Sequence, residues 1–330
     1  MSISQRLTVR VEQWPLKEPF VISRLVQEQG DVVVVEIERD GAVGRGECER
    51  ADWYDPERAP VVGEIEAIRA EIEAGLERSR LMSLLASGPA RNAVDCALWD
   101  LEAKLAGEPA WALAGLDQPP EPVTTVFTLS LDSPDKMGAA ARANRERPIL
   151  KLKLGRPGDP ERVAAVREAA PRARISVDAN TGWTREQLRG YMPELESLGV
   201  ELIEQPFRPG EDEALREVEH LIPIAADESC LDRGSLPGLA GCYDFVNVKL
   251  DKTGGLTEAL ALAREAKDCG YGVMVGCNIG TSLAMAPAML VAQLASFVDL
   301  DGPLLLARDR EPGLRYEESL IYPPSPDLWG

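Results

Sequence analysis

The chain has 330 residues, of which 45% are hydrophobic and 28% are charged, as is usual for a globular protein. This length accommodates a barrel of about 250 residues together with a smaller domain. The formal net charge of -19 argues against nucleic acid or an anionic membrane as the main partner, because both are polyanions. A single histidine, His220, argues against Ser-His-Asp and Cys-His catalysis and against multi-histidine zinc sites. Acid–base chemistry must therefore come from lysine, carboxylate or tyrosine side chains.

The cysteine pattern and the N-terminal segment bear on where the protein works. The six cysteines show no CxxC spacing, and the first residues, MSISQRLTVRVEQW, contain no apolar stretch typical of a signal peptide. The longest apolar runs are too short to span a bilayer. We expect reduced thiols in a cytoplasmic enzyme without membrane attachment.

The first third of the chain predicts strands followed by helices. Residues 6–14 and 31–41 have the apolar patterns of strands, with a turn at the Asp40-Gly41 pair. Residues 56–107 show helical periodicity, and Gly107 is suited to end the last helix. The proline-rich stretch 115–123 resembles a linker. We predict an α+β capping domain over residues 1–118.

After Pro122, short apolar segments alternate regularly with longer helical ones. The predicted strands cover residues 124–131, 149–155, 174–180, 200–207, 222–229, 245–251, 271–277 and 297–303. Eight strands in strict alternation with helices favour an α/β fold of the (β/α)8, or TIM, barrel type over residues 119–310. No GxGxxG motif supports a dinucleotide fold. Residues 311–330 are predicted to form a tail that packs back on the capping domain.

Ionisable residues stand at the carboxyl ends of five successive predicted strands. They are Lys151 and Lys153, then Asp178, Glu204, Asp227 and Lys249. One such residue alone would be read as a surface charge, since charged side chains are mostly exposed. Five in register, one strand-plus-helix unit apart, are expected to meet at the mouth of the barrel, where barrel active sites lie.

The types of these residues indicate the chemistry. The carboxylates of Asp178, Glu204 and Asp227 are hard oxygen ligands that suit Mg2+ or Mn2+ rather than zinc. Lys151 and Lys153 are two residues apart and face the same side of one strand, whereas the lysine on the 245–251 strand approaches from across the mouth. A divalent ion with lysines on both sides predicts removal of a proton next to a carboxylate.

Together these motifs resemble the enolase superfamily, and within it the muconate-lactonising-enzyme subgroup. The matching segments are KLK at 151–153, VDAN at 177–180, IEQP at 203–206, ADES at 226–229, VKLDKTGG at 248–255 and the helix at 88–107. The resemblance covers nearly the whole chain and implies the modified barrel of that superfamily. The mandelate-racemase subgroup uses a histidine–aspartate base, and no histidine lies in any barrel motif here.

The resemblance also implies a role for each site residue. Asp178, Glu204 and Asp227 would bind Mg2+, with Mn2+ as a possible substitute. Lys153 and Lys249 would be bases on opposite faces of the substrate, and Lys151 would help to bind the substrate carboxylate and enolate. Lys252 is an alternative to Lys249 for the catalytic role, but the motif alignment favours Lys249. Asn180 and Glu228 resemble residues that support the metal ligands.

The final strand distinguishes among the reactions known in this subgroup. Asp299 and Asp301 share one face, and this DxD pair resembles the motif with which dipeptide epimerases hold the ammonium group of the substrate. The implied function is inversion of the C-terminal α-carbon of an L-Ala-D/L-Glu-like dipeptide through a Mg2+-stabilised enediolate. Arg24 resembles the arginine that Ala-Glu epimerases place on the glutamate side chain.

Specificity is expected to depend on two N-terminal loops over the barrel mouth, at residues 19–30 and 46–57. The second loop departs from the expected pattern because it is acidic and carries Trp53 and Tyr54. Asn278 also stands where a larger apolar residue is common. Both departures leave the preferred side chain open.

Other functions remain possible at this stage. An N-acylamino acid racemase, such as an N-acetylglutamate racemase, needs the same lysines and metal, so only the DxD pair weighs against it. A cycloisomerase or an o-succinylbenzoate synthase is disfavoured for the same reason. Outside the subgroup, a Schiff-base aldolase or a non-catalytic binding protein are the alternatives. The substrate is expected to be a small molecule, and a homo-oligomer is possible.

Overall fold

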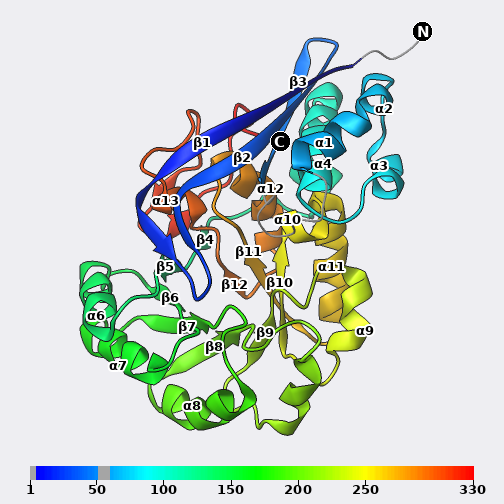
Figure 1. Ribbon diagram of the computed structural model, residues 1–330. Coiled ribbons are helices and arrows are strands. Elements are labelled where there is room, and N and C mark those ends of the chain that lie inside the picture. The colour runs from blue at the N-terminus through cyan, green and yellow to red at the C-terminus, as the bar shows by residue number, and fades with distance from the viewer. Residues whose placement is uncertain (1–4, 51–59) are drawn as a thin grey trace.

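The computed structural model describes residues 5–50 and 60–330, so the predicted loop residues Trp53 and Tyr54 lie outside the described part. An antiparallel sheet and a group of helices, coloured blue to cyan, cover one side of a curled parallel sheet (Figure 1). The carboxyl ends of the parallel strands face this cover.

The antiparallel sheet consists of three strands in sequence order. They are β1 (Arg6–Val21), β2 (Val26–Arg39) and β3 (Ala42–Glu49). The valine run of β2 is buried on both faces: Val33 and Val35 pack with the capping helices, whereas Val32 and Val34 pack with the main core. A strand covered on both sides reads as a continuous apolar run rather than as an alternation, which explains its sequence.

The helices of the capping domain pack closely against this sheet. They are α1 (Val61–Ala67), α2 (Arg69–Glu73), α3 (Arg78–Leu84), α4 (Pro89–Ala106) and α5 (Ala110–Leu113). Gly107 ends α4 in the left-handed conformation at φ 64°, as the sequence predicts. A Cβ at Gly44 or Gly46 would lie 2.1 Å from a carbonyl oxygen of α4, so glycine is required where β3 crosses this helix.

The loops predicted over the barrel mouth are shorter than expected. The 19–30 prediction was wrong in extent, because β1 continues to Val21 and β2 begins at Val26. Two cross-strand pairs, Phe20 with Gln27 and Val21 with Val26, extend the ladder into the predicted loop. Likewise, β3 continues to Glu49, inside the predicted 46–57 loop.

Eight parallel strands form the barrel sheet, in sequence order. They are β5 (Phe127–Leu129), β6 (Ile149–Lys153), β7 (Arg174–Asp178), β8 (Val200–Glu204), β9 (Ile224–Ala226), β10 (Phe245–Lys249), β11 (Gly272–Gly276) and β12 (Phe297–Val298). The backbone N–H of Val126, next to β5, donates to the carbonyl oxygen of Val298 at 2.9 Å, which links the two ends of the sheet. All eight predicted strands are confirmed, although each is shorter than predicted.

Helices connect the strands around the outside. They are α6 (Pro134–Ala143), α7 (Asp159–Ala169), α8 (Arg185–Ser197), η1 (Asp212–Glu217), η2 (Arg233–Ser235), α9 (Leu236–Leu239), α10 (Leu250–Thr253), α11 (Leu256–Asp268), α12 (Ser282–Ala292) and α13 (Gly302–Leu305). The prediction that strands alternate strictly with α-helices was wrong after β8. The helix there, η1, is a short 3-10 helix, and His220 lies beyond its end. The Asp212 carboxylate accepts hydrogen bonds from the Gly210 N–H and the Ser229 hydroxyl, which hold this segment near the end of β9.

The C-terminal residues return to the capping domain. Strands β13 (Tyr316–Glu317) and β14 (Leu320–Ile321) pair with β4 (Val123–Thr124) in a small sheet. Farther on, the Trp329 indole donates to the carbonyl oxygen of Cys96 at 3.0 Å, and the Gly330 N–H donates to Asp100 at 2.8 Å. The last residues therefore lie against α4. The domain limits at residues 118 and 310 stay predictions.

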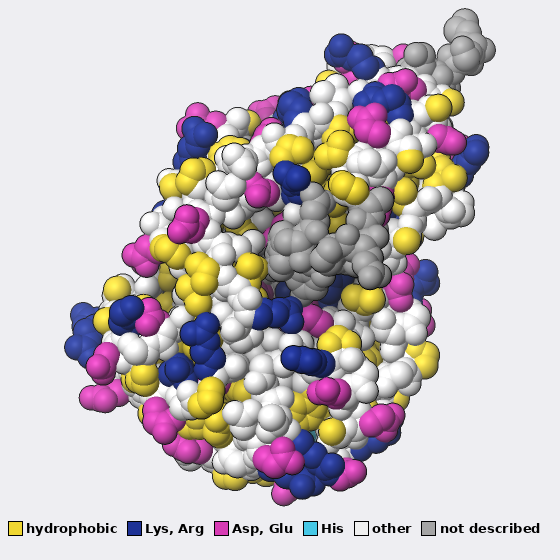
Figure 2. Space-filling model, viewed as in Figure 1, with side chains coloured by type: hydrophobic (Ala, Val, Ile, Leu, Met, Phe, Trp, Pro, Cys, Tyr) yellow, Lys and Arg dark blue, Asp and Glu magenta, His cyan; other side chains and the backbone are white. Residues whose placement is uncertain are grey.

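The surface and the thiols add two observations. Positively and negatively charged side chains are interspersed over the face seen in Figure 2, with the capping domain at the top. In the described part of the chain, no helix combines the length and the apolar character that crossing a bilayer requires. All six cysteines are free thiols, and Cys48, Cys96, Cys230 and Cys242 are buried.

Candidate active site

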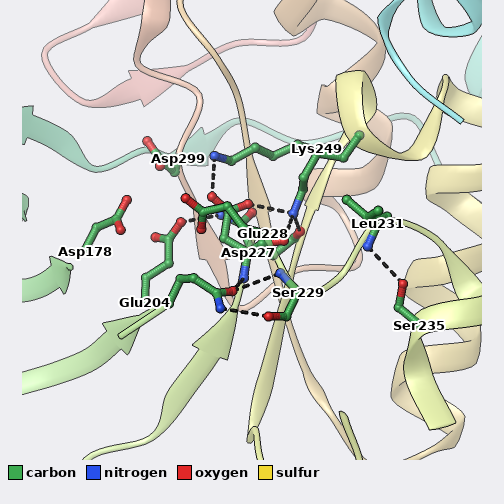
Figure 3. A network of polar contacts seen from close by, with 12 residues as sticks. Asp178, Glu204, Asp227, Glu228, Ser229, Leu231, Ser235, Lys249 and Asp299 are labelled. Atoms are coloured by element: carbon green, nitrogen blue, oxygen red, sulfur yellow. Dashed lines mark hydrogen bonds and ion pairs between the residues drawn. The ribbon is translucent and has the colours of Figure 1, made fainter. Parts of the chain in front are cut away.

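Neighbouring strands bring the predicted site residues to one level of the barrel. Lys153 is the register partner of Asp178, and Asp178 is the partner of Glu204, so three adjacent strands end together. Asp227 follows β9 directly, and Lys249 ends β10. Figure 3 shows Glu204, Asp227 and Lys249 pointing toward one another from their separate strands. All five side chains are buried.

Lys151 occupies the centre of this group. Its Nζ lies 2.5 Å from Glu204 Oε2, 2.6 Å from Asp299 Oδ2 and 3.4 Å from Asp178 Oδ2. Burial alone would lower the pKa of Lys151, but the three carboxylates outweigh it and hold the pKa well above its ordinary value. Lys151 is therefore a permanent positive charge at the base of the site.

Asn180 and Lys153 orient the carboxylate of Asp178. The Asn180 backbone N–H and side-chain amide donate to Asp178 at 2.9 and 3.1 Å, and Lys153 Nζ donates to the same side chain at 2.6 Å. Asn180 adopts a positive φ of 43°, a conformation that asparagine adopts more readily than most non-glycine residues. The role predicted for Asn180, support of a metal ligand, stays a prediction.

Glu204 has one oxygen with a hydrogen bond and one without. Asn247, a fully buried residue of β10, donates to Glu204 Oε1 at 2.8 Å. Glu204 Oε2 accepts no hydrogen bond of suitable geometry from any described residue, although the Lys151 ammonium lies nearby. Burial, followed by the charge of Asp178, raises the pKa of Glu204 to about 7. An additional cation beside Glu204 would offset this destabilisation of its charged form.

Asp227 is held by two lysines through its carboxylate and by Gln205 through its backbone N–H. Lys249 Nζ donates to Asp227 Oδ2 at 2.8 Å, and Lys252 Nζ lies 2.6 Å from Asp227 Oδ1. Burial works to raise the pKa of Asp227, but the two lysines outweigh burial and hold it far below its ordinary value. The buried amide of Gln205 accepts the Asp227 N–H at 2.7 Å, which links the ends of β8 and β9.

Lys252 is placed differently from Lys249. Its ammonium donates to the backbone carbonyl oxygens of Asn247, at 2.9 Å, and of Asp227. Lys249 lines the cavity between the capping domain and the barrel mouth, whereas Lys252 is not part of that lining. This arrangement favours Lys249 over Lys252 for contact with a substrate.

The residues present fit a divalent cation, with one qualification. Asp178, Glu204 and Asp227 are neighbours, but their oxygens are turned toward lysines and do not form a cluster within 4.8 Å; among the described residues, such a cluster is formed by Cys277, Asp299 and Asp301. Two buried oxygens, Glu204 Oε2 and Asp227 Oδ1, nevertheless lack hydrogen bonds of suitable geometry from the described residues. Both oxygens instead lie beside lysine ammonium groups, at 2.5 and 2.6 Å, and carboxylate oxygens that face positive charge are the donors that a hard cation also prefers.

The predicted DxD pair lies on the opposite side of Lys151. Asp299 contacts Lys151 at 2.6 Å, and Asp301 Oδ2 accepts the backbone N–H of Thr128 at 2.6 Å. Both side chains are buried and border the cavity. Burial, followed by the charge of Asp299, raises the pKa of Asp301 to about 7. A positively charged ligand group would be stabilised here.

A cavity lies between the capping domain and the barrel mouth. Of the predicted residues, Arg24, Lys153, Asn180, Asp227, Glu228, Lys249, Asn278, Asp299 and Asp301 line it. At one end, Arg24 forms a 3.0 Å ion pair with Glu228 and donates to the Thr181 hydroxyl. This lining of charged, polar and apolar side chains suits a small polar molecule.

Several lining residues were not named individually by the sequence analysis, although those up to residue 49 lie in the two segments predicted to cover the barrel mouth. They are Phe20, Ile22, Leu25, Gln27, Glu49, Thr128, Cys277, Ile279, Gly302 and Leu305. Glu49 offered a signal, because β3 reads Glu47-Cys48-Glu49 and places two carboxylates on one face. The buried Asn247 within the otherwise apolar FVNVK of β10 offered another. No local signal marked Gly302 or Ile279.

Comparison with known families identifies the fold. Residues 136–325 match the family model described as enolase C-terminal domain-like, and residues 4–115 match that of the mandelate racemase / muconate lactonizing enzyme N-terminal domain. The chain belongs to the enolase superfamily. The resemblance inferred from the strand-end motifs is thereby confirmed.

Two characterised relatives of this superfamily member are similar over most of its length. An L-Ala-D/L-Glu epimerase of Escherichia coli is 44% identical over 94% of this chain and 97% of the relative. An N-acetyl-D-glutamate racemase of Pseudoalteromonas is 44% identical over 77% of this chain and 80% of the relative. Both relatives are isomerases.

Two solved structures resemble it closely. An enolase family member from Agrobacterium tumefaciens with homology to dipeptide epimerases, solved with sodium and L-Ala-L-Glu, is 48% identical with a TM-score of 0.96, covering 99% of this chain and 100% of the other. A dipeptide epimerase from Enterococcus faecalis, solved with Mg and L-Leu-L-Tyr, is 30% identical with a TM-score of 0.89, covering 98% of each chain. The enolase-like barrel with its N-terminal capping domain is thereby confirmed.

Proposed function

We propose that this protein is a dipeptide epimerase that inverts the α-carbon of the C-terminal residue of an L-Ala-D/L-Glu-like dipeptide. The observation that carries the proposal is the placement of Lys153 and Lys249, which border one cavity from strands four positions apart in the sheet. One lysine removes the α-proton, and the other returns a proton to the opposite face. The epimerase relatives support this assignment.

Three carboxylates, those of Asp178, Glu204 and Asp227, are proposed to hold Mg2+, with Mn2+ as a possible substitute. Their hard oxygen donors and the Mg found with the Enterococcus faecalis epimerase support this choice. When bound, the ion supplies positive charge beside the substrate carboxylate, which makes the adjacent α-proton more acidic. Lys151, at the base of the site, adds a second positive charge for that carboxylate and for the negative charge that develops on it.

The remaining polar residues are proposed to fix the ends of the dipeptide. Asp299 and Asp301 accept the N-terminal ammonium group, since two buried carboxylates favour a cation between them. Arg24 exchanges part of its contact with Glu228 for the side-chain carboxylate of the substrate. Asn180 holds Asp178 in place, and Glu228 holds Arg24.

An N-acylamino acid racemase is the second candidate, supported by the Pseudoalteromonas relative. The lysines and the proposed metal site serve either reaction. An N-acyl nitrogen carries no charge, so it would leave Asp299 and Asp301 without a cation to accept. The DxD pair therefore favours the dipeptide.

The test is deuterium uptake from D2O at the C-terminal α-carbon of L-Ala-L-Glu, with N-acetyl-L-glutamate measured in parallel by mass spectrometry. The wild type should exchange the dipeptide in the presence of Mg2+, and Lys153→Ala and Lys249→Ala should each lose epimerisation. Lys136→Ala, an exposed lysine of α6 that pairs with Asp132, is the matched control and should keep it. Full activity of Lys249→Ala in both directions would rule out the two-base assignment.

Two broader features belong to the same proposal. The free thiols support a reducing, cytoplasmic location. Association into a homo-oligomer is proposed as well, and size-exclusion chromatography with light scattering tests it directly.

A further inference from the structure

Three polar residues that the reaction scheme leaves unused form one wall of the cavity. They are Gln27 of β2, Glu49 at the end of β3 and Asn278 just after β11. Gln27 Nε2 donates to Glu49 Oε1 at 3.3 Å, and the Asn278 side chain forms a second hydrogen bond with the same carboxyl group. Glu49 is 5% exposed, so this group is built into the wall rather than solvated.

The wall is polar, and its surroundings favour the neutral form of the Glu49 carboxyl group. Burial, followed by the negative charge of Asp251, raises the pKa of Glu49 to about 8, even though Gln27, Lys249 and Asn278 work in the opposite direction. A neutral carboxyl group between two amides offers both hydrogen-bond donors and acceptors. An aliphatic group placed against it would exclude water from the donors and acceptors that these side chains do not use on one another, which costs free energy.

The position of the wall identifies the part of the substrate that it faces. Glu49 lies close enough to Lys249 for the lysine charge to act on it, and both border the same cavity. The reacting α-carbon must lie beside Lys249. The substituent of that carbon nearest to the capping domain is the C-terminal side chain, because the ammonium end is directed to Asp299 and Asp301.

We propose that Gln27, Glu49 and Asn278 are specificity-determining residues that select C-terminal side chains ending in a carboxamide or carboxylate over aliphatic side chains of similar size. This inference rests on the proposed epimerase function, in which Arg24 binds the side-chain carboxylate, and adds three residues that contact the same C-terminal side chain. Asn278 supplies the polar contact at the position where the resemblance leads one to expect a larger apolar residue.

The experiment compares kcat/KM for deuterium exchange on L-Ala-L-Gln and L-Ala-L-Met, whose side chains are similar in length, with L-Ala-L-Lys in parallel. The wild type should prefer Gln over Met by at least about tenfold, the value of one hydrogen bond. Asn278→Leu and Glu49→Met should each reduce that preference by about tenfold. Glu49→Gln, which keeps a neutral hydrogen-bonding group, should stay within about threefold of the wild type.

Asn144→Leu is the matched control, since Asn144 lies at the end of α6, outside the cavity lining, and should leave the preference unchanged. Far-UV circular dichroism and melting temperatures confirm that each variant is folded. An unchanged Gln-to-Met preference in Asn278→Leu, or a wild type that prefers the Lys dipeptide, overturns this inference alone. A wild type that exchanges no dipeptide overturns the proposed function and this inference together.

Discussion

The carboxylate of Glu47 and the guanidinium of Arg310 lie 2.7 Å apart in a largely buried contact that joins β3 to the C-terminal segment. The same carboxylate accepts the backbone N–H and the hydroxyl of Thr281 at 2.7 and 2.5 Å, and Arg310 also contacts Glu12 at 2.7 Å. Thr281 follows Asn278 and Ile279 in the chain, and both of these residues line the cavity. One carboxylate therefore connects the capping domain, the cavity wall and the segment that directly precedes the predicted tail.

Replacing Glu47 by Gln should destabilise the protein, because it removes one of the two carboxylates that contact Arg310 in the described part of the chain and weakens the hydrogen bonds from Thr281. Removing one partner of a buried ion pair costs about 3–5 kcal/mol, and the remaining contact with Glu12 should limit the loss to about 2 kcal/mol. Urea unfolding measures this loss in the free energy of unfolding. The KM for the dipeptide should rise as well, because the cavity wall is held less firmly.

Glu36→Gln is the matched control for this change. Glu36 pairs with Arg10 on the neighbouring strands β2 and β1, but that pair is partly exposed. An exposed ion pair contributes about 0–1 kcal/mol. Equal losses in Glu36→Gln and Glu47→Gln would contradict the special role of Glu47.

Asp301→Asn should weaken dipeptide binding while leaving the chemistry intact. Asparagine keeps the hydrogen bond from the Thr128 N–H but removes the charge that would accept an ammonium group. Hydrogen bonds to charged groups contribute about 1.5–3 kcal/mol, so KM should rise about tenfold or more, with kcat nearly unchanged. Exchange on N-acetyl-L-glutamate should not worsen. A loss of kcat at unchanged KM would place Asp301 in the chemistry instead.

The strand-end residues could be predicted because one regularity fixes them. A parallel strand is short and mostly apolar up to its carboxyl end, and successive strands end at one mouth, so Lys153, Asp178 and Glu204 indicate the site from the sequence. The cavity wall could not be predicted in this way. Gln27 is in place because β2 begins earlier than predicted, and Glu49 because β3, which the sequence analysis did not predict as a strand, pairs with β2; such pairing joins distant residues.

The arrangement of side-chain oxygens was also beyond the sequence. Spacing places Asp178, Glu204 and Asp227 on adjacent strands, but it does not say that lysines contact each of them. Those contacts depend on rotamers and on the balance of buried charge around Lys151. The 3-10 helix after β8 was missed for a similar reason, since Asp212 binds residues outside its own segment.

Glu204→Gln should abolish stabilisation by Mg2+. The wild type should melt at a higher temperature with Mg2+ than with EDTA, because a ligand that binds only the folded state adds about 2.7 kcal/mol at about a hundred times its Kd. The Glu204→Gln variant loses one anionic ligand, and its melting temperature should hardly change with Mg2+. Differential scanning fluorimetry measures this without relying on activity. An equal shift in both proteins would remove Glu204 from the proposed ligand set.

Lys249→Met and Lys252→Met should separate two functions of neighbouring lysines. Lys249 reaches the cavity, so its loss should reduce exchange by at least about a thousandfold, in the range of general acid–base catalysis. Lys252 binds the backbone carbonyl oxygens of Asn247 and Asp227, so its loss should mainly lower stability, by about 1–3 kcal/mol. Exchange kinetics and urea unfolding of both variants provide the comparison. The reverse result would make Lys252 the base.

His220 should make the free energy of unfolding depend on pH. Its Nδ1 lies 2.8 Å from Asp244 Oδ2, and this hydrogen bond raises the pKa of His220 above its ordinary value. A raised pKa in the folded state means that the stabilisation is complete below the ordinary pKa near about 6.5 and is lost as the pH rises through the folded value. His220→Gln should therefore be less stable than the wild type at about pH 5.5, by less than about 1 kcal/mol because Asp244 is partly exposed.

The two proteins should approach equal stability above about pH 8. Since the chain has one histidine, its imidazole proton signal in NMR can be followed without ambiguity and reports the folded pKa directly. Asp244→Asn is the control that returns the pKa of His220 toward its ordinary value. A histidine that titrates below its ordinary pKa in the wild type, or a stability difference that grows with rising pH, would show that burial outweighs the Asp244 contact.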